Sequence, residues 1–517
     1  MEKTIYTLWN TSVEKHADLP AIRWLEGKEV KEISYGALNE KALNVKKGLA
    51  AKGFSGAHLA LIGVSSVEWM QTYLGITTGG NVAIPLDILL PPKELIELLV
   101  RSDSEGVFLD PRLAPLAPAI KASCPKIRGI WFFTPVEGAE TVQDLADAGA
   151  AAGDVALTEP LGSDIATIVY TSGTTGKSKG VLLTQENLYS NVEAIIYNVD
   201  PGVVFMSVLP IHHAFCLVMD WMQAFWMGAV VCINDSFLHM VRNMSIFKPD
   251  VMLMVPLMIE TIYKRLKAAA DPNIPPALIG QKVFGGKLKH VFTGGAHLEP
   301  FYIDEFAKYG VMVLEGYGMS ECSPVISSNR VRSYKPGSIG RPLPGVEISF
   351  ADNGEILVKS ASVMKGYYKM EEETNEALKD GWLHTGDKGY MDEDGFLFIN
   401  GRVKNLIILS NGENVSPEEI EGTLCLNDLI EEVVVMGEGN GLTAHIYASP
   451  ELTEGWAPEK VQEELQKILD KFNEEQPSYR RLTKLVVRKN PFIKNATRKI
   501  LRHEAHRDEP VAPPAQG

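Results

Sequence analysis

Apolar and polar positions alternate along most of the chain between helical spacing and short, continuous apolar runs. Residues 34–51 and 68–75 repeat apolar side chains at helical spacing, whereas residues 58–64 read as a strand. Residues 75–87 place glycines before a short apolar run, which is typical of a helix end that turns into a parallel strand. Further buried strands are expected at 165–170, 180–183 and 291–293, and a helix capped by Thr184 is expected through 196. This alternation predicts an α/β fold.

The last third of the chain carries turn and helix-start signals of a different kind. Residues 352–354 (Asp-Asn-Gly) are a turn signal between apolar runs, and residues 405–415 contain the Asn-Gly pair of a tight hairpin. Ser416 followed by Pro417 predicts a helix start, with Glu419 completing a capping box. Strands are expected at 432–436, 442–448 and 482–487, and a helix at 458–475. These elements predict a compact α+β unit.

Length and composition indicate that the chain has more than one domain. At 517 residues the chain is too long for one core, and 45% hydrophobic content is ample for two. We expect a large N-terminal domain over 1–402, with layered α/β sheets and a small β-rich subdomain, and a mobile small α+β domain over 403–508. An Ala/Pro/Gly-rich stretch at 113–153 reads as linker-like surface, and the Pro-rich tail from His503, above all 509–517, as disordered.

Charge and cysteine usage exclude several classes of protein. A net charge of -15 argues against broad binding of nucleic acid or anionic membrane, so any polyanion site must be built locally. The cysteines lack CxxC pairing, which fits reduced thiols in a cytosolic chain better than disulfides or a zinc site; they are Cys124, Cys216, Cys232, Cys322 and Cys425. The N-terminal stretch has no apolar core of a secretory signal.

One stretch, residues 214–233, has the length of a membrane span. It carries Asp220 and Gln223 near its middle, where charge at mid-bilayer would cost several kcal/mol. We therefore expect a buried helix and strand in a soluble protein, with a membrane anchor as the alternative.

Residues 170–180, YTSGTTGKSKG, form a Gly-rich, hydroxyl-rich run with lysines between two expected strands, here called the phosphate loop. Glycines let backbone N–H groups converge on an anion, while hydroxyls and lysine add bonds and charge. A Walker A loop is excluded because it needs four residues before its Gly-Lys-Ser, whereas Thr174 and Thr175 alone separate Gly173 from Gly176. The alternative is a mobile surface loop.

Two more Gly-rich turns follow expected strands, at 294–296 and within 311–322 (VMVLEGYGMSEC). Such turns lie at the carboxyl edge of an α/β sheet, where these folds bind ligands. His212 and His213 also stand at a strand end, and they could be simple polar residues there. Asp387, in a Thr-Gly-Asp run, is either a solvated turn residue or an acceptor for ribose hydroxyls.

The phosphate loop resembles that of the adenylate-forming superfamily, which includes acyl-CoA synthetases, luciferases and nonribosomal-peptide adenylation domains. The order of elements matches this superfamily over nearly the whole chain, most closely its ligases of long- and medium-chain fatty acids and CoA. The resemblance implies an acid–thiol ligase that uses ATP, Mg²⁺ and coenzyme A and passes through an acyl-AMP. It implies phosphate contacts from Thr171, Ser172, Gly173, Thr174, Thr175, Gly176, Lys179 and Ser320. It implies adenine and ribose contacts from Gly294, Gly295, Ala296, Glu315, Gly316, Tyr317, Asp387 and Arg402.

The same resemblance implies the catalytic groups. His213 matches a histidine that borders the acyl site, and Glu321 matches the Mg²⁺-binding carboxylate. Lys499 falls at the position of the catalytic lysine within residues 491–502, although Arg498 replaces the usual glycine there. The alternative is that the basic residues within 491–502 form a solvent-exposed face and have no catalytic role. Lys404 matches the hinge position, and the residues implied to face CoA are Gly412, Glu413 and Asn414.

The sequence restricts the chemical class of the acid substrate only in part. Peptide synthetases carry an Asp after the histidine, where Ala214 and Phe215 stand here, which favours an acid without an α-amine. Apolar residues could line an acyl tunnel or simply pack in the core; they are Phe215, Leu217, Val218, Trp221, Met222, Phe225 and Trp226, with Met252, Met254 and Met258. Three rivals stay open: loading of a carrier-protein phosphopantetheine, activation of an aryl acid, and a non-catalytic nucleotide-binding module.

Overall fold

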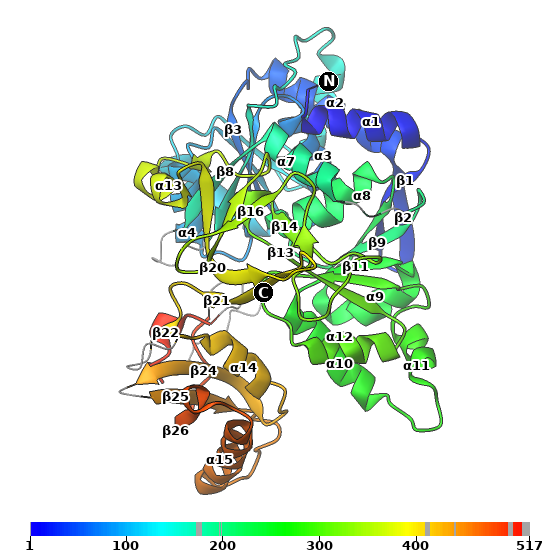
Figure 1. The fold of residues 1–517 in the computed structure, drawn as a ribbon. Helices are drawn as coiled ribbons and strands as arrows, with labels where there is room; N and C mark the ends of the chain where they lie inside the picture. Colours follow the sequence, from blue (N-terminus) through cyan, green and yellow to red (C-terminus); the bar gives the residue numbers. More distant parts are fainter. Residues whose placement is uncertain are drawn as a thin grey trace.

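The computed structural model describes residues 2–171, 178–195, 197, 199–408, 414–438, 441–494 and 500–508. A large N-terminal part holds three sheets, and a smaller C-terminal unit follows strand β21 (Leu397–Arg402). Figure 1 shows the smaller unit below the larger one, with helix α14 (Pro417–Leu424) on the side that faces it. The α/β class with a smaller α+β unit is confirmed.

The first sheet of the large part has nine strands in the order β15-β14-β13-β12-β11-β9-β10-β1-β2. Neighbours from β1 through β13 along this order run parallel. The central strands β9, β10 and β11 are mostly apolar and buried along their whole length, since both faces of the sheet are covered there. Its strands are β1 (Pro20–Glu26), β2 (Glu29–Ser34), β9 (Val204–Ser207), β10 (Val230–Ile233), β11 (Val251–Met254), β12 (His290–Thr293), β13 (Met312–Gly318), β14 (Val325–Ser328) and β15 (Arg341–Pro342). Helices of its crossovers include α9 (Met240–Phe247), α10 (Pro256–Ala268), α11 (Pro276–Val283) and α12 (Pro300–Lys308).

The second sheet has seven strands in the order β18-β8-β7-β4-β3-β5-β6. Its strands are β3 (His58–Ile62), β4 (Val82–Leu86), β5 (Gly106–Leu109), β6 (Gly129–Phe132), β7 (Ile165–Thr171), β8 (Lys179–Thr184) and β18 (Gly366–Tyr367). Its helices and those beside it are α1 (Ile5–His16), α2 (Tyr35–Ala51), α3 (Val67–Thr77), α4 (Pro92–Arg101) and α7 (Gln185–Ala194). The predicted helices at 34–51 and 68–75 are confirmed as α2 and α3, each capped by a serine hydroxyl that accepts from a backbone N–H.

The linker-like interpretation of residues 113–153 is wrong. This stretch contains α5 (Ala117–Ser123), strand β6 and α6 (Val142–Ala151). Thr141 and Asp144 form a capping box at the start of α6, and Val142 and Leu145 are buried in the core. Alanine and glycine read as linker in sequence, but here they let α6 pack closely on α2: a Cβ on Gly149 would lie 2.0 Å from the Asn44 carbonyl oxygen.

The third sheet is the small β-rich part. Its strands are β16 (Glu347–Phe350), β17 (Glu355–Lys359), β19 (Leu378–Lys379), β20 (Trp382–Met391) and β21, with α13 (Glu371–Ala377) beside them. The predicted turn at 352–354 joins β16 and β17, and the Gly354 N–H donates to the Ala351 carbonyl oxygen. Strand β20 carries Asp387 and pairs with β21, so that Asp387 lies opposite Arg402.

The C-terminal unit begins with the short hairpin of β22 (Ile407–Ile408) and β23 (Asn414–Val415) and continues into α14. The predicted capping box at α14 is wrong, because the Ser416 hydroxyl donates to Glu418 and makes no capping bond, while Glu419 pairs with Arg480. Strands β24 (Ile430–Glu438), β25 (Gly441–Ala448) and β26 (Leu482–Val487) form its sheet, with α15 (Pro458–Glu474) on one face.

The prediction of a disordered tail fails at its first residues, 503–508. Arg488 is 5% exposed and donates to the carbonyl oxygens of Ala505 and Arg507, at 2.6 and 2.5 Å. Ala505 is buried against Val434 and Phe492. Residues 509–517 lie outside the described part of the chain.

The stretch 214–233 forms the expected buried helix and strand. A π-helical turn, η2 (Cys216–Met222), leads into α8 (Gln223–Trp226) and then β10, and every side chain of η2 is buried. Within the described residues, no helix combines the length and apolar character needed to cross a bilayer. All five cysteines are free thiols, as expected.

Candidate active site

Strands β7 and β8 run antiparallel and place Thr171 opposite Lys179 at the mouth of the phosphate loop. This is the predicted strand–loop–strand arrangement; residues 172–177 of the loop lie outside the described part of the chain. The Arg101 Nη2 donates to the Ser178 carbonyl oxygen at 2.7 Å and holds the outgoing end of the loop. Arg101 stands on α4, far away in sequence, and no sequence signal marks it.

Glu321 follows β13 in the short 3₁₀ turn that Ser320 begins, and the residue is 8% exposed. The Tyr367 hydroxyl donates to the Glu321 Oε1 at 2.8 Å, and the Lys179 Nζ lies 4.7 Å from the centre of the Tyr367 ring. Tyr367 belongs to the seven-stranded sheet, whereas Glu321 follows a strand of the nine-stranded sheet. One tyrosine therefore connects the phosphate loop to the predicted metal-binding carboxylate, and sequence reasoning missed it.

Asp387 accepts bonds from two residues that the sequence also assigned to the nucleotide. The Tyr317 hydroxyl donates to its Oδ2 at 2.7 Å, and the Arg402 Nε donates to its Oδ1 at 2.8 Å. Burial, together with the nearby Asp387 carboxylate, holds the pKa of Tyr317 well above its usual value, so the hydroxyl stays a donor. Since Tyr317 lies on the nine-stranded sheet and Asp387 on the five-stranded one, these two sheets meet at this site.

The turn after β12 supplies the predicted residues Gly294, Gly295 and Ala296. A Cβ on Gly294 would lie 2.9 Å from the Gly316 carbonyl oxygen, so only glycine allows this close approach, and Gly295 has a left-handed φ of +83°. Glu315, on the adjacent β13, is 7% exposed, and burial raises its pKa to about 7. A buried carboxyl that changes charge near neutral pH therefore borders these glycines.

The histidine pair lies in the turn after β9. The two rings are 4.1 Å apart between centroids, and the His212 Nε2 lies 3.7 Å from the Asp87 Oδ2. Burial, with His213 beside it, keeps the pKa of His212 well below its usual value, so His212 is neutral at physiological pH. His213 is the one of the two that the resemblance selects.

A mostly apolar pocket lies over the nine-stranded sheet, and strands β9, β11, β12 and β14 contribute to its lining. One wall is the helical face of Met219, Gln223 and Met227, spaced by four residues. Strand β14 forms another wall with Val325 and Ser328, and Ser328 pairs in register with Gly316. The rest of the lining is Ile195, Tyr197, Phe205, Leu253, Phe292, Asn329, Arg330 and Leu343.

The side chains that line this pocket differ from those that the sequence suggested for an acyl tunnel. Core packing, the alternative, holds for Leu217, Val218, Trp221, Met222 and Phe225, which are all buried in the main core. Met252 and Met254 belong to the core on the other face of the sheet from Leu253, because side chains alternate along a strand.

Comparisons with known proteins agree with this geometry. Residues 9–368 match the model of the AMP-binding enzyme family, and residues 404–508 match that of the AMP-binding enzyme C-terminal domain. The chain is 30% identical over 459 residues to the long-chain-fatty-acid–CoA ligase FadD15 of Mycobacterium bovis, covering 79% of this chain and 76% of that protein. The chain belongs to the AMP-binding enzyme family.

Solved structures of AMP-binding enzymes share the fold along nearly the whole chain. ATP-bound MatB from Rhodopseudomonas palustris superposes with a TM-score of 0.80 at 26% identity, covering 97% of this chain and 98% of that one. The anthranilate CoA ligase AuaEII, in complex with anthranoyl-AMP, has a TM-score of 0.82 at 21% identity, with 97% and 96% covered. Together with the family match and the likeness to FadD15, this makes the chain an adenylate-forming enzyme of the acid–thiol ligase class, as the sequence predicted.

The C-terminal unit of this AMP-binding enzyme contacts the large part close to the turn at 294–296 and at helix α10. A Cβ on Gly422 of α14 would lie 2.4 Å from the Glu299 Oε1, just after the 294–296 turn, and Lys267 pairs with Asp428 at 3.1 Å. Lys404 is exposed in the turn between the two parts.

Several predicted site residues fall outside the described part of the chain. They are Ser172, Gly173, Thr174, Thr175 and Gly176 of the phosphate loop, Lys499, and Gly412 and Glu413. Asn414 is described only as the first residue of β23. Their roles stay predictions.

Proposed function

We propose that the enzyme activates an alkyl carboxylic acid of medium or long chain with ATP and transfers it to coenzyme A. The observation that carries this proposal is the pairing of β13 with β14. Gly316 and Tyr317, assigned to the nucleotide, pair with Ser328 and Ser327, and Ser328 lines the apolar pocket. A flexible apolar chain in that pocket would have its carboxylate end beside the nucleotide.

The reaction has two halves. A carboxylate oxygen of the acid attacks the α-phosphorus of ATP, the bond to the β-phosphate oxygen breaks, and acyl-AMP and pyrophosphate form. The sulfur of coenzyme A then attacks the acyl carbon, and AMP leaves. The chain supplies no nucleophile in either half, so its contribution is to position the substrates and stabilise charge.

In this proposal, side chains of the large part bind the nucleotide. Tyr317 keeps its ring for the adenine and fixes the Asp387 carboxylate through its hydroxyl. Asp387 is oriented from its other oxygen by Arg402 and accepts from the ribose hydroxyls. The phosphate loop and Lys179 bind the departing pyrophosphate, and Lys499 stabilises the charge that grows around the α-phosphorus.

Mg²⁺ fits the chemistry of Glu321. A buried carboxylate oriented by one tyrosine hydroxyl is the hard oxygen ligand that this ion prefers. Bound there, the ion would neutralise charge on the β- and γ-phosphates. Tyr367 orients the carboxylate for this purpose.

Names of relatives support the alkyl acid, since FadD15 at 30% identity is a long-chain-fatty-acid–CoA ligase. An aryl acid is the second candidate. Phe292 and Tyr197 line the same pocket with their rings edge to face, 5.2 Å apart, and could enclose an aromatic substrate.

The test is acid-dependent exchange of labelled pyrophosphate into ATP over a panel of straight-chain and aromatic acids. We expect exchange to rise with chain length and to stay low for benzoate-like acids. Preference for aromatic acids would establish the second candidate instead, and no exchange with any acid would contradict both. A thiol assay that offers free coenzyme A or a carrier protein with phosphopantetheine then decides the acceptor.

A further inference from the structure

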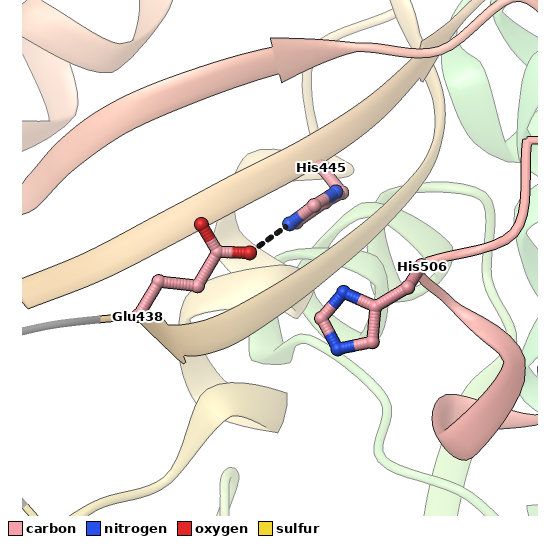
Figure 2. Close-up of side chains that lie close together, drawn as sticks. All are labelled: Glu438, His445 and His506. Atoms are coloured by element: carbon pink, nitrogen blue, oxygen red, sulfur yellow. Dashed lines mark hydrogen bonds and ion pairs between the residues drawn. The ribbon is translucent and has the colours of Figure 1, made fainter.

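Three side chains of the C-terminal unit converge at a place that the adenylation chemistry does not use. Glu438 ends β24, His445 lies in β25, and His506 comes from the segment after residue 500; Figure 2 shows their side chains directed toward one another. One ligand atom of each lies within 4.8 Å of the others. In the described part of the chain, no other group of three histidine, cysteine or carboxylate side chains is this close.

The packing of the final segment brings His506 to this position. His445 pairs in register with Val434, and Ala505 is buried on Val434. The residue after Ala505 therefore falls beside His445. The histidine rings are 6.0 Å apart between centroids.

The backbone around His506 is held firmly on both sides. The buried Arg488 donates to the carbonyl oxygens of Ala505 and Arg507, the residues immediately before and after it. Asp508 accepts from the backbone N–H groups of Lys489 and Asn490, each at 3.0 Å. His506 itself is exposed, so its ring can reorient while its backbone stays in place.

The Glu438 carboxylate already has a donor on each oxygen. The His445 Nε2 lies 2.9 Å from Oε1, and the Lys484 Nζ lies 3.2 Å from Oε2. Lys484 occupies one oxygen only and leaves Oε1 to face the imidazoles.

We propose that Glu438, His445 and His506 form a binding site for a borderline divalent cation, Zn²⁺ in particular. Two imidazoles and one carboxylate are a zinc donor set, and three protein ligands leave a fourth position for water. Tetrahedral bonds of about 2.0–2.1 Å place ligand atoms about 3.4 Å apart, so a small closure from the observed spacing suffices.

The bound ion would tie the final segment to the sheet. His506 would be joined through the metal to β24 and β25, at a point beyond the contacts of Ala505 and Arg488. The ion would therefore stabilise the fold of the C-terminal unit, and the proposal stands independently of the proposed acid substrate.

The test uses the untagged full-length protein, freed of metal with a chelator and titrated with Zn²⁺ alone by calorimetry. We expect one ion per chain, and a rise in the thermal unfolding midpoint when Zn²⁺ is added. Co²⁺ in its place should give the visible absorption of tetrahedral nitrogen and oxygen coordination.

Two histidine variants test whether Zn²⁺ binds at the cluster that contains His506. His506→Ala should weaken Zn²⁺ binding at least about tenfold and abolish the thermal shift. His503→Ala is the matched control, because His503 is an exposed histidine three residues away that lies outside the cluster, and it should bind like wild type. If both variants or neither lose binding, or if no ion binds, the proposal is wrong.

The positive charge of Lys484 provides a further test of whether Glu438 binds the cation. Its ammonium lies beside the carboxylate and opposes a cation there, so Lys484→Met should bind Zn²⁺ more tightly than wild type. Weaker binding in this variant would count against Glu438 as a ligand.

Discussion

The Tyr317 hydroxyl donates to the Asp387 Oδ2 at 2.7 Å, across the junction of two sheets. Neither residue has its partner nearby in sequence, and both were assigned to the nucleotide separately. The bond gives one carboxylate a fixed orientation from the large sheet, while Arg402 fixes it from its own sheet. A carboxylate that is held from two sides, the proposed ribose acceptor, loses little freedom when substrate binds.

Tyr317→Phe should raise the KM for ATP about tenfold with a smaller effect on kcat. The variant keeps the ring and removes one hydrogen bond to a charged group, which is worth about 1.5–3 kcal/mol. Initial rates of pyrophosphate exchange at varied ATP measure this. Tyr390→Phe is the control, since Tyr390 lies on the same strand as Asp387, is 51% exposed and stacks on Phe398. Equal KM values in the two variants would contradict the role of the Tyr317 hydroxyl.

Tyr367→Phe should increase the Mg²⁺ concentration needed for half-maximal exchange, about tenfold, because the Glu321 carboxylate loses the donor that orients it. The ring under Lys179 is kept. The adjacent Tyr368→Phe serves as control, because that hydroxyl donates to a different carboxylate, Asp103. A Mg²⁺ dependence that both variants shift equally would show a general effect on the fold.

Met219→Trp should fill the pocket and change the preference among acids. The ratio of kcat/KM for long over short straight-chain acids should fall at least about tenfold, since each excluded methylene costs about 1–3 kcal/mol. The ratio within one variant controls for partial loss of folded protein. A uniform loss over all chain lengths would mean that Met219 supports the core without contacting substrate.

The contribution of the buried Asp220 carboxyl to the free energy of unfolding should fall as pH rises. Asp220 is fully buried in η2, its Oδ1 has no hydrogen-bond partner among the described residues, and burial raises its pKa to about 8. The folded protein thus holds a proton that the unfolded chain releases near pH 4, so this contribution to stability is complete below about pH 4 and is lost as pH rises toward 8.

Asp220→Asn removes this titration. The stability of the variant relative to wild type should therefore increase with pH, by up to about 1.4 kcal/mol per pH unit between about pH 5 and 7. Urea unfolding at several pH values measures the difference. Parallel pH profiles for the two proteins would refute the assignment.

Lys499→Ala should slow adenylation about 10²- to 10³-fold, because one charge partner of the transition state is lost. Thioester formation from supplied acyl-AMP should survive. Lys494→Ala is the matched control from the same basic cluster, since the Lys494 Nζ is paired with the Glu432 Oε1 at 2.5 Å. If both half-reactions fall equally, or if the control behaves the same, the cluster is the solvated face considered as the alternative.

The sequence by itself determined the elements whose signals are local. The helical spacing of 34–51, the strand–loop–strand around residues 170–180 and the turn at 352–354 depend on neighbours within a few residues, and all are present. The family was also readable, because a phosphate loop needs glycines and hydroxyls in one short run. By contrast, 113–153 was misread, since alanine and glycine indicate a linker until the partner helix that they pack against is known.

Only the tertiary structure decided how distant residues cooperate. Three hydrogen bonds join residues that are far apart in sequence: Arg101 to Ser178, Tyr367 to Glu321, and Tyr317 to Asp387. They form because the order of the strands in the sheets differs from their order in the sequence. The pocket shows the same limit. Spacing marked the helix after His213 as apolar on most sides, but only packing placed Met219, Gln223 and Met227 along the pocket. An apolar pattern reports that a side chain is buried, and the choice between core and pocket depends on what the rest of the fold places opposite it.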